Sequence, residues 1–370
     1  MKKKIFIITG EASGDKLASH IVDYFDHKKY EIQAIGSSHL KQKKIKLLFD
    51  SSEISVMGFV DVIKKIFSLI NKINYTVNFI KKFRPHIVFS IDAPDFSFRV
   101  EKKIKKVLPD IKIIHFVAPT IWAWRENRAA VFKTFIDHIL LLFPFEVAIF
   151  NKWKIKNTYV GHPFFEKKIL YKKYFLKKNK QIITFCPGSR LSEIKTFMPL
   201  FMKLINKINH KYGENFLYHF PINPNHKKMV YDYFYKKNLI LITTNEDMKN
   251  FYIKNSIFSV AKSGTVSLDV CKNNCPLITV YKTSWLNYFL IKPFVKVNFG
   301  NIVNIIAKKE IIPEFIQSKC NVDNVFVKIS EFLNNKKMRL SNVSNYKKII
   351  KLITKKNTTK IISSVIKKYA

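Results

Sequence analysis

KKKIFIITGEASGD (residues 2–15) runs from a short apolar segment into a loop with two glycines, Gly10 and Gly14. The whole chain of 370 residues contains only nine glycines, which is about a third of the usual share. A composition crowded with Lys, Asn, Ile and Phe indicates drift that removes glycine wherever another residue is tolerated. We therefore expect the remaining glycines where φ is positive or where the backbone closely approaches another group.

Short apolar runs alternate with longer amphipathic ones along the chain. This alternation predicts βαβ units and an α/β fold with parallel sheets. The chain is also longer than one hydrophobic core usually serves. The strands are expected at 5–9, 86–92, 111–117 and 138–143, and then at 181–185, 216–220, 239–244, 256–261 and 276–282.

The pattern restarts near residue 180, after a lysine-rich stretch without strand character. We expect two Rossmann-like domains facing a cleft, over residues 1–172 and 173–340. Residues 341–370 are lysine-rich and helical in pattern, and form a tail that packs back on a domain.

The charge is strongly positive, with 66 Lys and Arg against 26 Asp and Glu, a net charge of +40. This balance favours anionic partners such as anionic lipid surfaces or phosphorylated substrates, although lysine drift on a solvated surface explains it equally well. The lysines are scattered without an RNA-binding signature, so no nucleic-acid partner is predicted. Four irregularly spaced cysteines indicate reduced thiols in a cytosolic protein. No apolar run is long enough for a signal peptide or a membrane span.

Ligands of open parallel sheets bind outside the carboxyl ends of the strands, so the loops there are candidate sites. The loop after the first strand contains Gly10, Glu11, Ser13, Gly14 and Asp15. It is more acidic than a phosphate cradle and suits a sugar or an alcohol nucleophile. The alternative is a tight turn in which Asp15 caps the following helix.

SIDAPDFSF (90–98) places Asp92 at the end of a buried strand, where a partly desolvated carboxylate can act as a general base. The alternative is a helix cap, a role that we assign to Asp95. In VAPTIWAWRENR (117–128), Trp124 and Arg125 suit sugar stacking and phosphate contact, while core packing explains the tryptophan equally well.

Two loops of the second half share one design: a strand, a glycine turn and a helix start. They are FCPGSRLSEI (185–194) and AKSGTVSLDVC (261–271). Each alone could be an ordinary capped helix, but together they favour a nucleotide diphosphate site, because helix N-termini attract anions. Asp269 could bind ribose hydroxyls. The candidate residues are Gly188, Ser189, Arg190, Glu193, Ser263, Gly264, Thr265 and Asp269.

The segment 59–70 is more apolar than one core-facing helix needs. It could lie in a lipid interface, with neighbouring lysines drawn to anionic headgroups, or it could be a core helix. The candidate membrane-contacting residues are Val60, Ile63, Ile66, Phe67 and Ile70. The sequence shows no metal-binding motif, so we expect no metal.

Taken together, the motifs resemble those of the lipid-A-disaccharide synthases, inverting glycosyltransferases of the GT-B fold. The matching segments occur in order over nearly the whole chain. They are GEASGD (10–15), VMGFVDV (56–62), IDAPDF (91–96), WAWR (122–125), PFE (144–146), VGHP (160–163), PGSR (187–190) and SGT (263–265).

The resemblance implies transfer of diacylglucosamine from UDP-2,3-diacylglucosamine to 2,3-diacylglucosamine 1-phosphate. The products would be UDP and the β(1→6) disaccharide 1-phosphate of lipid A, part of Gram-negative lipopolysaccharide. It implies that Asp92 is required, that Arg190 belongs to the site and that Asn301 binds substrate. The family's LPN appears here as FGN (299–301), and its glutamate in the helix after SGT is Asp269.

The resemblance further implies a cytoplasmic protein, peripheral on the inner face of the inner membrane, and C-terminal helices exchanged in a homodimer. No cofactor is expected, since the UDP-sugar is a substrate. We expect Asp92 to deprotonate the acceptor hydroxyl, with Glu11 or Asp15 as alternative bases, and Arg190 and helix N-termini to stabilise UDP without a metal. The competing hypotheses are a UDP-N-acetylglucosamine epimerase-like enzyme of the same architecture and a non-catalytic basic membrane-binding protein.

Overall fold

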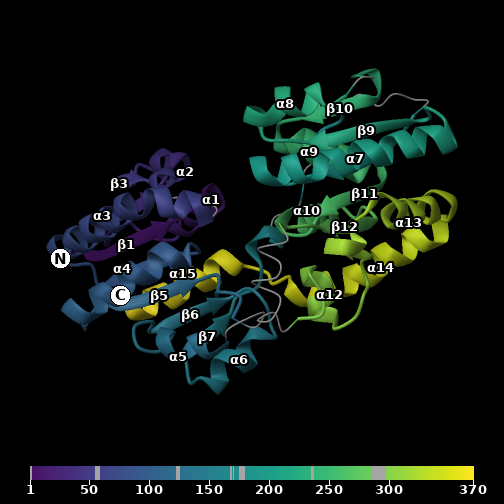
Figure 1. The fold of residues 1–370 in the computed structure, drawn as a ribbon. Coiled ribbons are helices and arrows are strands. Elements are labelled where there is room, and N and C mark those ends of the chain that lie inside the picture. The colour runs from purple at the N-terminus through teal and green to yellow at the C-terminus, as the bar shows by residue number, and fades with distance from the viewer. Residues whose placement is uncertain are drawn as a thin grey trace. The chain divides into compact units, whose positions relative to one another are not determined.

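The computed structural model describes residues 2–54, 59–121, 126–166, 169, 171–174, 180–234, 237–284 and 297–370. The chain divides into two compact units. Unit 1 contains Met1–Glu166 together with Ile353–Ala370, and unit 2 contains Lys167–Leu352. Each unit is an α/β sandwich around its own parallel sheet (Figure 1).

The sheet of unit 1 has seven described strands in the order β3-β2-β1-β4-β5-β6-β7, and all neighbours pair in parallel. The chain order therefore reverses between β1 and β4, which is where open parallel sheets bind ligands. The strands are β1 (Lys3–Thr9), β2 (Tyr30–Gly36), β3 (Lys46–Asp50), β4 (Ile87–Ile91), β5 (Lys112–Phe116), β6 (His138–Leu141) and β7 (Asn157–Tyr159).

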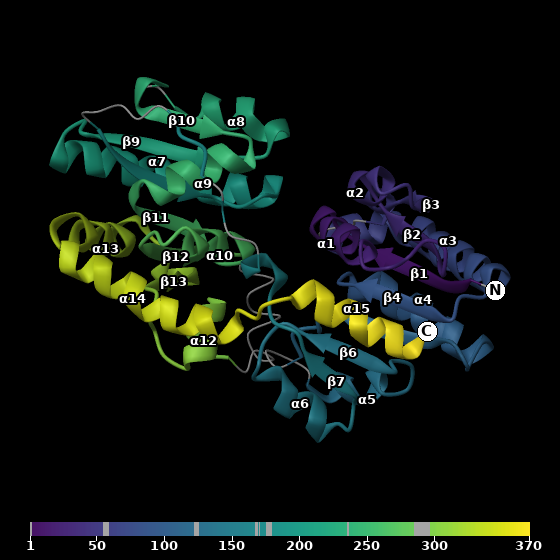
Figure 2. The same cartoon turned by 180° about the vertical axis from the view of Figure 1, so that it is seen from behind.

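Alternate residues of β1 serve the two faces of this sheet. Phe6 and Ile8 join one core cluster, and Ile5 and Ile7 join the other, as the two-residue period of a strand dictates. The first face is covered by α3 (Phe59–Phe83), α4 (Pro94–Val107), α5 (Ala129–Phe132) and α6 (Glu146–Lys152). The other face is covered by α1 (Ala12–Val22), α2 (Ser38–Gln42) and the C-terminal α15 (Thr358–Tyr369), as Figure 2 shows for α15.

The sheet of unit 2 repeats the arrangement in the order β10-β9-β8-β11-β12-β13, again with parallel pairs. The change of direction here lies between β8 and β11. The strands are β8 (Gln181–Cys186), β9 (Phe216–Pro221), β10 (Ile240–Thr243), β11 (Ser256–Lys262), β12 (Leu277–Tyr281) and β13 (Glu314–Ile316).

Helices flank this second sheet as well. The apolar faces of α7 (Leu191–Tyr212) and α13 (Val322–Asn334) form the largest core cluster of unit 2 together with inward residues of β8 and β9. The remaining described helices are α8 (Lys227–Asp232), α9 (Glu246–Lys254), α10 (Thr265–Lys272), α12 (Ile302–Ala307) and α14 (Lys336–Ile353).

The strand runs expected from the sequence all form strands, and the structure adds β2, β3, β7 and β13. The expected tail, 341–370, is divided between the units. Asn342 and Tyr346 of α14 hydrogen-bond to the backbone of Leu277 and Cys275 in unit 2. In contrast, α15 packs on the sheet of unit 1.

Two further expectations concern cysteines and membrane spans. Cys186, Cys271, Cys275 and Cys320 are all free, as expected, and all four are buried. Burial raises the pKa of each of these thiols, so the buried thiols stay protonated at neutral pH. Among the described residues, no helix has the length and apolar character to cross a membrane.

Candidate functional site

Asp92 lies directly after β4 on a turn with an unusual backbone. Its φ is +56° and that of Ala93 is +50°, a region that non-glycine residues adopt infrequently. The Asp92 amide donates to the carbonyl of Phe116 (3.0 Å), and its carbonyl accepts from Oγ of Ser97 (3.1 Å). Asp92 is a half-buried residue, and no described residue hydrogen-bonds to its carboxylate. A carboxylate at a strand end that receives no hydrogen bond from the described residues is suited to accept a proton from a bound hydroxyl.

Gly10 brings the first glycine loop against this turn. A Cβ on Gly10 would overlap the Cβ of Ala93, so only glycine lets the two backbones approach this closely. Gly14 is less constrained, because a Cβ there would lie 3.4 Å from Cγ2 of Ile91. The contact places residues 10–11 and Asp92 at one edge of the sheet.

Asp15, the alternative base, is engaged elsewhere. Its side chain is completely buried, and its oxygens accept from the Ser37 amide (2.7 Å), the Ser37 hydroxyl (2.8 Å) and the His39 amide (2.9 Å). The carboxylate thus holds the turn between β2 and α2. Glu11 is the N-cap residue of α1 without a capping side-chain bond, and Ser13 is exposed in the first turn.

Asp95 does not cap α4 as expected. The N-cap residue is Ala93, no side chain caps it, and Asp95 lies exposed in the first turn. Pro94 provides the first helical residue, where its missing N–H is no loss.

Glu193 organises the first glycine loop of unit 2, residues 187–190 (the Gly188 loop). Its Oε2 accepts from the amides of Ser189 (3.1 Å) and Arg190 (3.3 Å), and its Oε1 accepts from Nζ of Lys262 (2.8 Å). Although burial raises the pKa of Glu193, the Lys262 hydrogen bond and charge outweigh it and hold the pKa below its usual value. Gly188 has φ +114°, and a Cβ there would overlap Glu193.

The second glycine loop, residues 262–265 (the Gly264 loop), starts α10. Gly264 has φ +147°, and both Gly264 and Thr265 are exposed at the helix N-terminus. Ser263 is buried and donates to the carbonyl of Gly300 (2.7 Å). Its hydroxyl therefore connects the Gly264 loop to the loop at residue 300 and does not face solvent. The Arg190 side chain is about half exposed. Two exposed residues at the N-terminus of α10, together with the Arg190 guanidinium, form an environment for an anion.

Asp269, expected near a ribose, forms an ion pair. Its Oδ2 lies 3.2 Å from Nζ of Lys249 on α9. Burial raises the pKa of Asp269, and the charge of Lys249 opposes this shift. The ribose assignment stays a prediction that requires Lys249 to share this carboxylate.

Asn301 is completely buried, and its Oδ1 caps α12 by accepting from the Val303 amide (2.9 Å). Its Nδ2 has no hydrogen-bond partner among the described residues. Glu314, at the start of β13, accepts from the amides of Gly300 and Asn301 (both 2.9 Å) and thereby fixes the loop. Burial raises the pKa of Glu314, against the effect of these bonds.

Some expected site residues lie outside the described part of the chain. These are Trp124 and Arg125, and the side chains of Val60, Ile63 and Ile66. On the described part of α3, Phe67 is 79% and Ile70 is 41% exposed.

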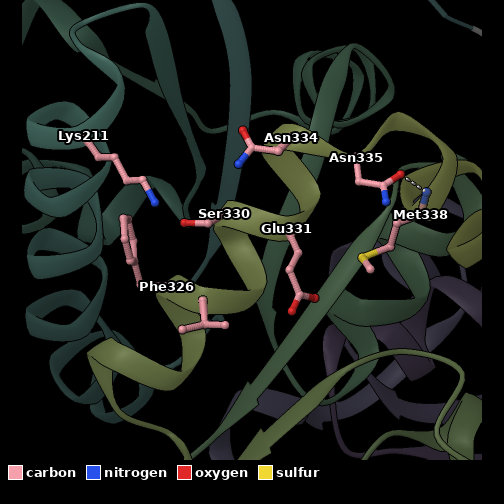
Figure 3. A pocket seen from close by; sticks show the side chains of 8 residues that line it. Lys211, Phe326, Ser330, Glu331, Asn334, Asn335 and Met338 are labelled. Atoms are coloured by element: carbon pink, nitrogen blue, oxygen red, sulfur yellow. Dashed lines mark hydrogen bonds between the residues drawn. The ribbon is translucent and has the colours of Figure 1, made fainter.

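A surface groove of about 450 Å³ lies elsewhere on unit 2, between α7 and α13 and the start of α14 (Figure 3). Its lining includes Lys211, Phe326, Ser330 and Met338. None of the candidate site residues lines it.

The candidate residues form two groups. One lies at the carboxyl ends of β1 and β4 in unit 1, and the other lies at the carboxyl ends of β8 and β11 in unit 2. The first offers a carboxylate for proton transfer, and the second offers an anion site.

Sequence reasoning did not identify Lys262, Lys249 or Glu314 as site residues. Lys262 was detectable from its place in the SGT loop, whereas nothing in the local sequence of Glu314 indicated that it holds residues 300–301. Within the described ranges, no three His, Cys, Asp or Glu side chains are grouped as metal ligands would be.

Comparison with known sequences gives one consistent result. The family model for lipid-A-disaccharide synthetase matches residues 5–366. Lipid-A-disaccharide synthase from Rickettsia bellii (strain OSU 85-389) is 34% identical over 342 residues, which cover 90% of this chain and 89% of that protein. The enzyme of the same name from Rickettsia prowazekii is 32% identical over 358 residues, covering 94% and 93%.

Solved structures agree on the architecture. UDP-GlcNAc 2-epimerase from Neisseria meningitidis bound to UDP-GlcNAc is similar with a TM-score of 0.65, at 12% identity, over 99% of this chain and 100% of that one. MurG from Acinetobacter baumannii gives 0.57 at 11% identity over 99% of each chain. Likeness at such identity concerns the fold alone, and it confirms the expected GT-B fold of two Rossmann-like domains.

Proposed function

Because the chain belongs to the lipid-A-disaccharide synthase family of glycosyltransferases, we propose that it joins UDP-2,3-diacylglucosamine to 2,3-diacylglucosamine 1-phosphate. The products are the β(1→6) disaccharide 1-phosphate and UDP. The observation that carries the proposal is that Asp92 is a half-buried residue at a strand end and its carboxylate has no described hydrogen-bond partner.

The reaction is a single displacement. The acceptor's 6-hydroxyl loses its proton to Asp92, and its oxygen forms a bond to the anomeric carbon of the donor. The bond from that carbon to the β-phosphate oxygen breaks, and the electron pair leaves with UDP. One bond forms and one breaks on opposite faces of the carbon, so the configuration inverts.

Asp92 is a better base than the two other acidic candidates. Asp15 has both oxygens occupied by the 37–39 turn, and protonating it would weaken those bonds. Glu11 has interactions of its own. Asp92 can take up a proton without losing any hydrogen bond to the described protein.

The diphosphate is assigned to the N-terminus of α10 and to Arg190. The amides of Ser189 and Arg190, directly before α7, are already occupied by the Glu193 carboxylate. We therefore assign the diphosphate to the exposed Gly264 and Thr265. Arg190 supplies a permanent positive charge for the departing UDP. We propose that these groups act without a metal ion and that no cofactor is needed.

Both substrates carry acyl chains, so the enzyme must reach a bilayer surface. The exposed Phe67 and Ile70 on α3 offer an apolar contact, and the net charge of +40 suits anionic headgroups. We propose a cytoplasmic protein, peripheral on the inner face of the inner membrane. A homodimer stays a prediction, which sedimentation velocity tests.

The decisive experiment incubates the purified protein with UDP-2,3-diacylglucosamine in detergent micelles, with and without 2,3-diacylglucosamine 1-phosphate. The expected result is disaccharide 1-phosphate and stoichiometric UDP only when both substrates are present. A change of the donor sugar without acceptor would instead identify an epimerase-like enzyme. Binding to micelles without any turnover would support the non-catalytic alternative and overturn the proposal.

A further inference from the structure

Three polar residues are completely buried beneath the turn that carries Asp92. They are Ser90 on β4, His115 on β5 and Glu101 on α4, and each has a relative exposure of 0%. Ser90 and His115 are direct partners in the register of the two strands. A buried polar group must find hydrogen bonds within the protein to offset its lost hydration.

His115 uses both ring nitrogens. Its Nδ1 lies 2.6 Å from Oγ of Ser90, and its Nε2 lies 3.2 Å from the carbonyl oxygen of Val117. Because a carbonyl only accepts, Nε2 carries a hydrogen and donates it to Val117. The ring is also packed edge-on against Phe98 of α4, with centroids 4.6 Å apart. Hydrogen bonds on two sides and an aromatic contact leave the imidazole one orientation.

Glu101 places a carboxyl group near Nδ1 of the His115 ring, the nitrogen that also contacts Ser90. Its Oε1 lies 3.8 Å from Nδ1 of His115, and neither of its oxygens receives a hydrogen bond from a described residue. A buried carboxyl group in this state is costly, and its only described polar neighbour at ion-pair distance is the imidazole.

The bond from His115 ends on a strained part of the backbone. Val117 has φ +72°, which is an outlier for a β-branched residue. The preceding carbonyl, that of Phe116, accepts from the Asp92 amide. The turn at Val117 and the turn at Asp92 are thus joined, and both must be held by surrounding contacts because neither conformation is favourable by itself.

We propose that His115 is a positioning residue for Asp92. By holding the Val117 carbonyl, His115 fixes the neighbouring Phe116 carbonyl, which accepts from the Asp92 amide. The Ser90 hydroxyl and the Phe98 ring keep the imidazole in place. This inference rests on the proposed function, in which Asp92 is the base. A displacement of about 1 Å at such a group can cost about a hundredfold in rate.

The test is a double-mutant cycle on turnover. His115→Phe keeps a ring against Phe98 but removes both hydrogen bonds, and it is measured with Asp92 present and in the Asp92→Asn background. We expect a 10- to 100-fold lower kcat with Asp92, an unchanged KM for the UDP-sugar, and less than a twofold further loss in Asp92→Asn. His115→Gln, which can still donate to Val117, should recover most of the activity.

The matched control is His138→Phe, which replaces a buried histidine on neighbouring β6. His138 pairs with Ile114 but faces the other side of the sheet, where it contacts Tyr369 of α15. It should leave kcat within twofold. An equal loss from His115→Phe in both backgrounds would overturn the positioning role while leaving Asp92 as the base. Normal turnover of Asp92→Asn itself would overturn both. If His115→Phe does not fold, Ser90→Ala takes its place in the same cycle, with the same required non-additivity.

Discussion

Nζ of Lys262 donates a 2.8 Å hydrogen bond to Oε1 of Glu193 and so joins the end of β11 to the first turn of α7. The other oxygen of Glu193 holds the amides of Ser189 and Arg190. One carboxylate therefore sets the geometry of both glycine loops in unit 2. The lysine also lies over the ring of Tyr281 (5.8 Å), which limits its freedom further.

Replacing Glu193 by Gln should loosen both loops. We expect a loss of about 1–3 kcal/mol in the free energy of unfolding, because hydrogen bonds to a charged partner are lost and Lys262 is left without its partner. The KM for the UDP-sugar should rise. Urea unfolding and steady-state kinetics measure the two effects.

Glu331→Gln is the control, because its pairing with Lys328 is half exposed on the helix surface and should contribute less than about 0.5 kcal/mol. Equal effects of the two variants would contradict the assigned role.

Asp92→Asn should lower kcat by about 10²–10⁴-fold, the usual contribution of a general base, without changing the thermal unfolding temperature. Rapid-quench assays of disaccharide formation measure the rate. Asp95→Asn is the matched control, since Asp95 is exposed three residues further along the same segment, and it should retain turnover within a few-fold. Comparable losses in both variants would argue against a specific role for Asp92.

The two glycines that follow β1, Gly10 before α1 and Gly14 in its first turn, should differ in their tolerance of alanine. Gly10→Ala would drive a Cβ into Ala93, and overpacking of this kind costs about 1–3 kcal/mol. Turnover should fall as well, because the Asp92 turn must shift. Gly14→Ala meets only ordinary contacts and should change stability by less than about 1 kcal/mol. Chemical denaturation of both variants gives the comparison, and a stable, fully active Gly10→Ala protein would refute the close approach.

Stability should decline as the pH falls below about 6.5. Burial lowers the pKa of His219 to about 3 and that of His138 to about 4. Below pH 6.5 the unfolded chain therefore binds protons that the folded chain does not, and each histidine removes about 1.4 kcal/mol per pH unit. The contribution of each buried neutral histidine to the free energy of unfolding is complete above pH 6.5. It is lost progressively as the pH falls toward the pKa of that histidine in the folded chain.

Urea unfolding at pH 7.5, 6.5 and 5.5 measures this loss before most carboxylates titrate. His219→Gln should flatten the pH dependence of the free energy of unfolding, whereas replacement of the exposed His27 should leave it unchanged. An unaltered slope in His219→Gln would show that the histidine does not carry the linkage.

Membrane binding through α3 makes a separate prediction. The double variant Phe67→Ser and Ile70→Ser should reduce co-sedimentation with vesicles that contain anionic phospholipid, and high salt should weaken binding of the unaltered protein. Val107→Ser, at an exposed apolar residue on α4 (49%), is the control and should bind normally. Salt-insensitive binding that survives the double variant would place the contact elsewhere.

The sequence predicted the two-sheet architecture because its central strands are continuous apolar runs, as in Ile5–Ile8. Strand β2 escaped prediction because YEIQAIG mixes polar residues into a half-buried strand. For the site, Gly10 and Asp92 were recognisable from their positions after strands. The role of Asp15 depends on residues 37–39, and that of Glu314 depends on residues 300–301. Such contacts between segments distant in the chain leave no local pattern to find.

The final helix has a consequence for how the molecule is made. Ile362, Val365 and Ile366 of α15 fill one face of the sheet that starts at residue 3, and Tyr369 contacts His138. During synthesis, the sheet face of unit 1 that α15 covers therefore stays exposed until all of unit 2 has been synthesised. A fragment that ends at residue 166 would keep that surface exposed to water, so it should aggregate, whereas adding residues 353–370 in trans should rescue its solubility.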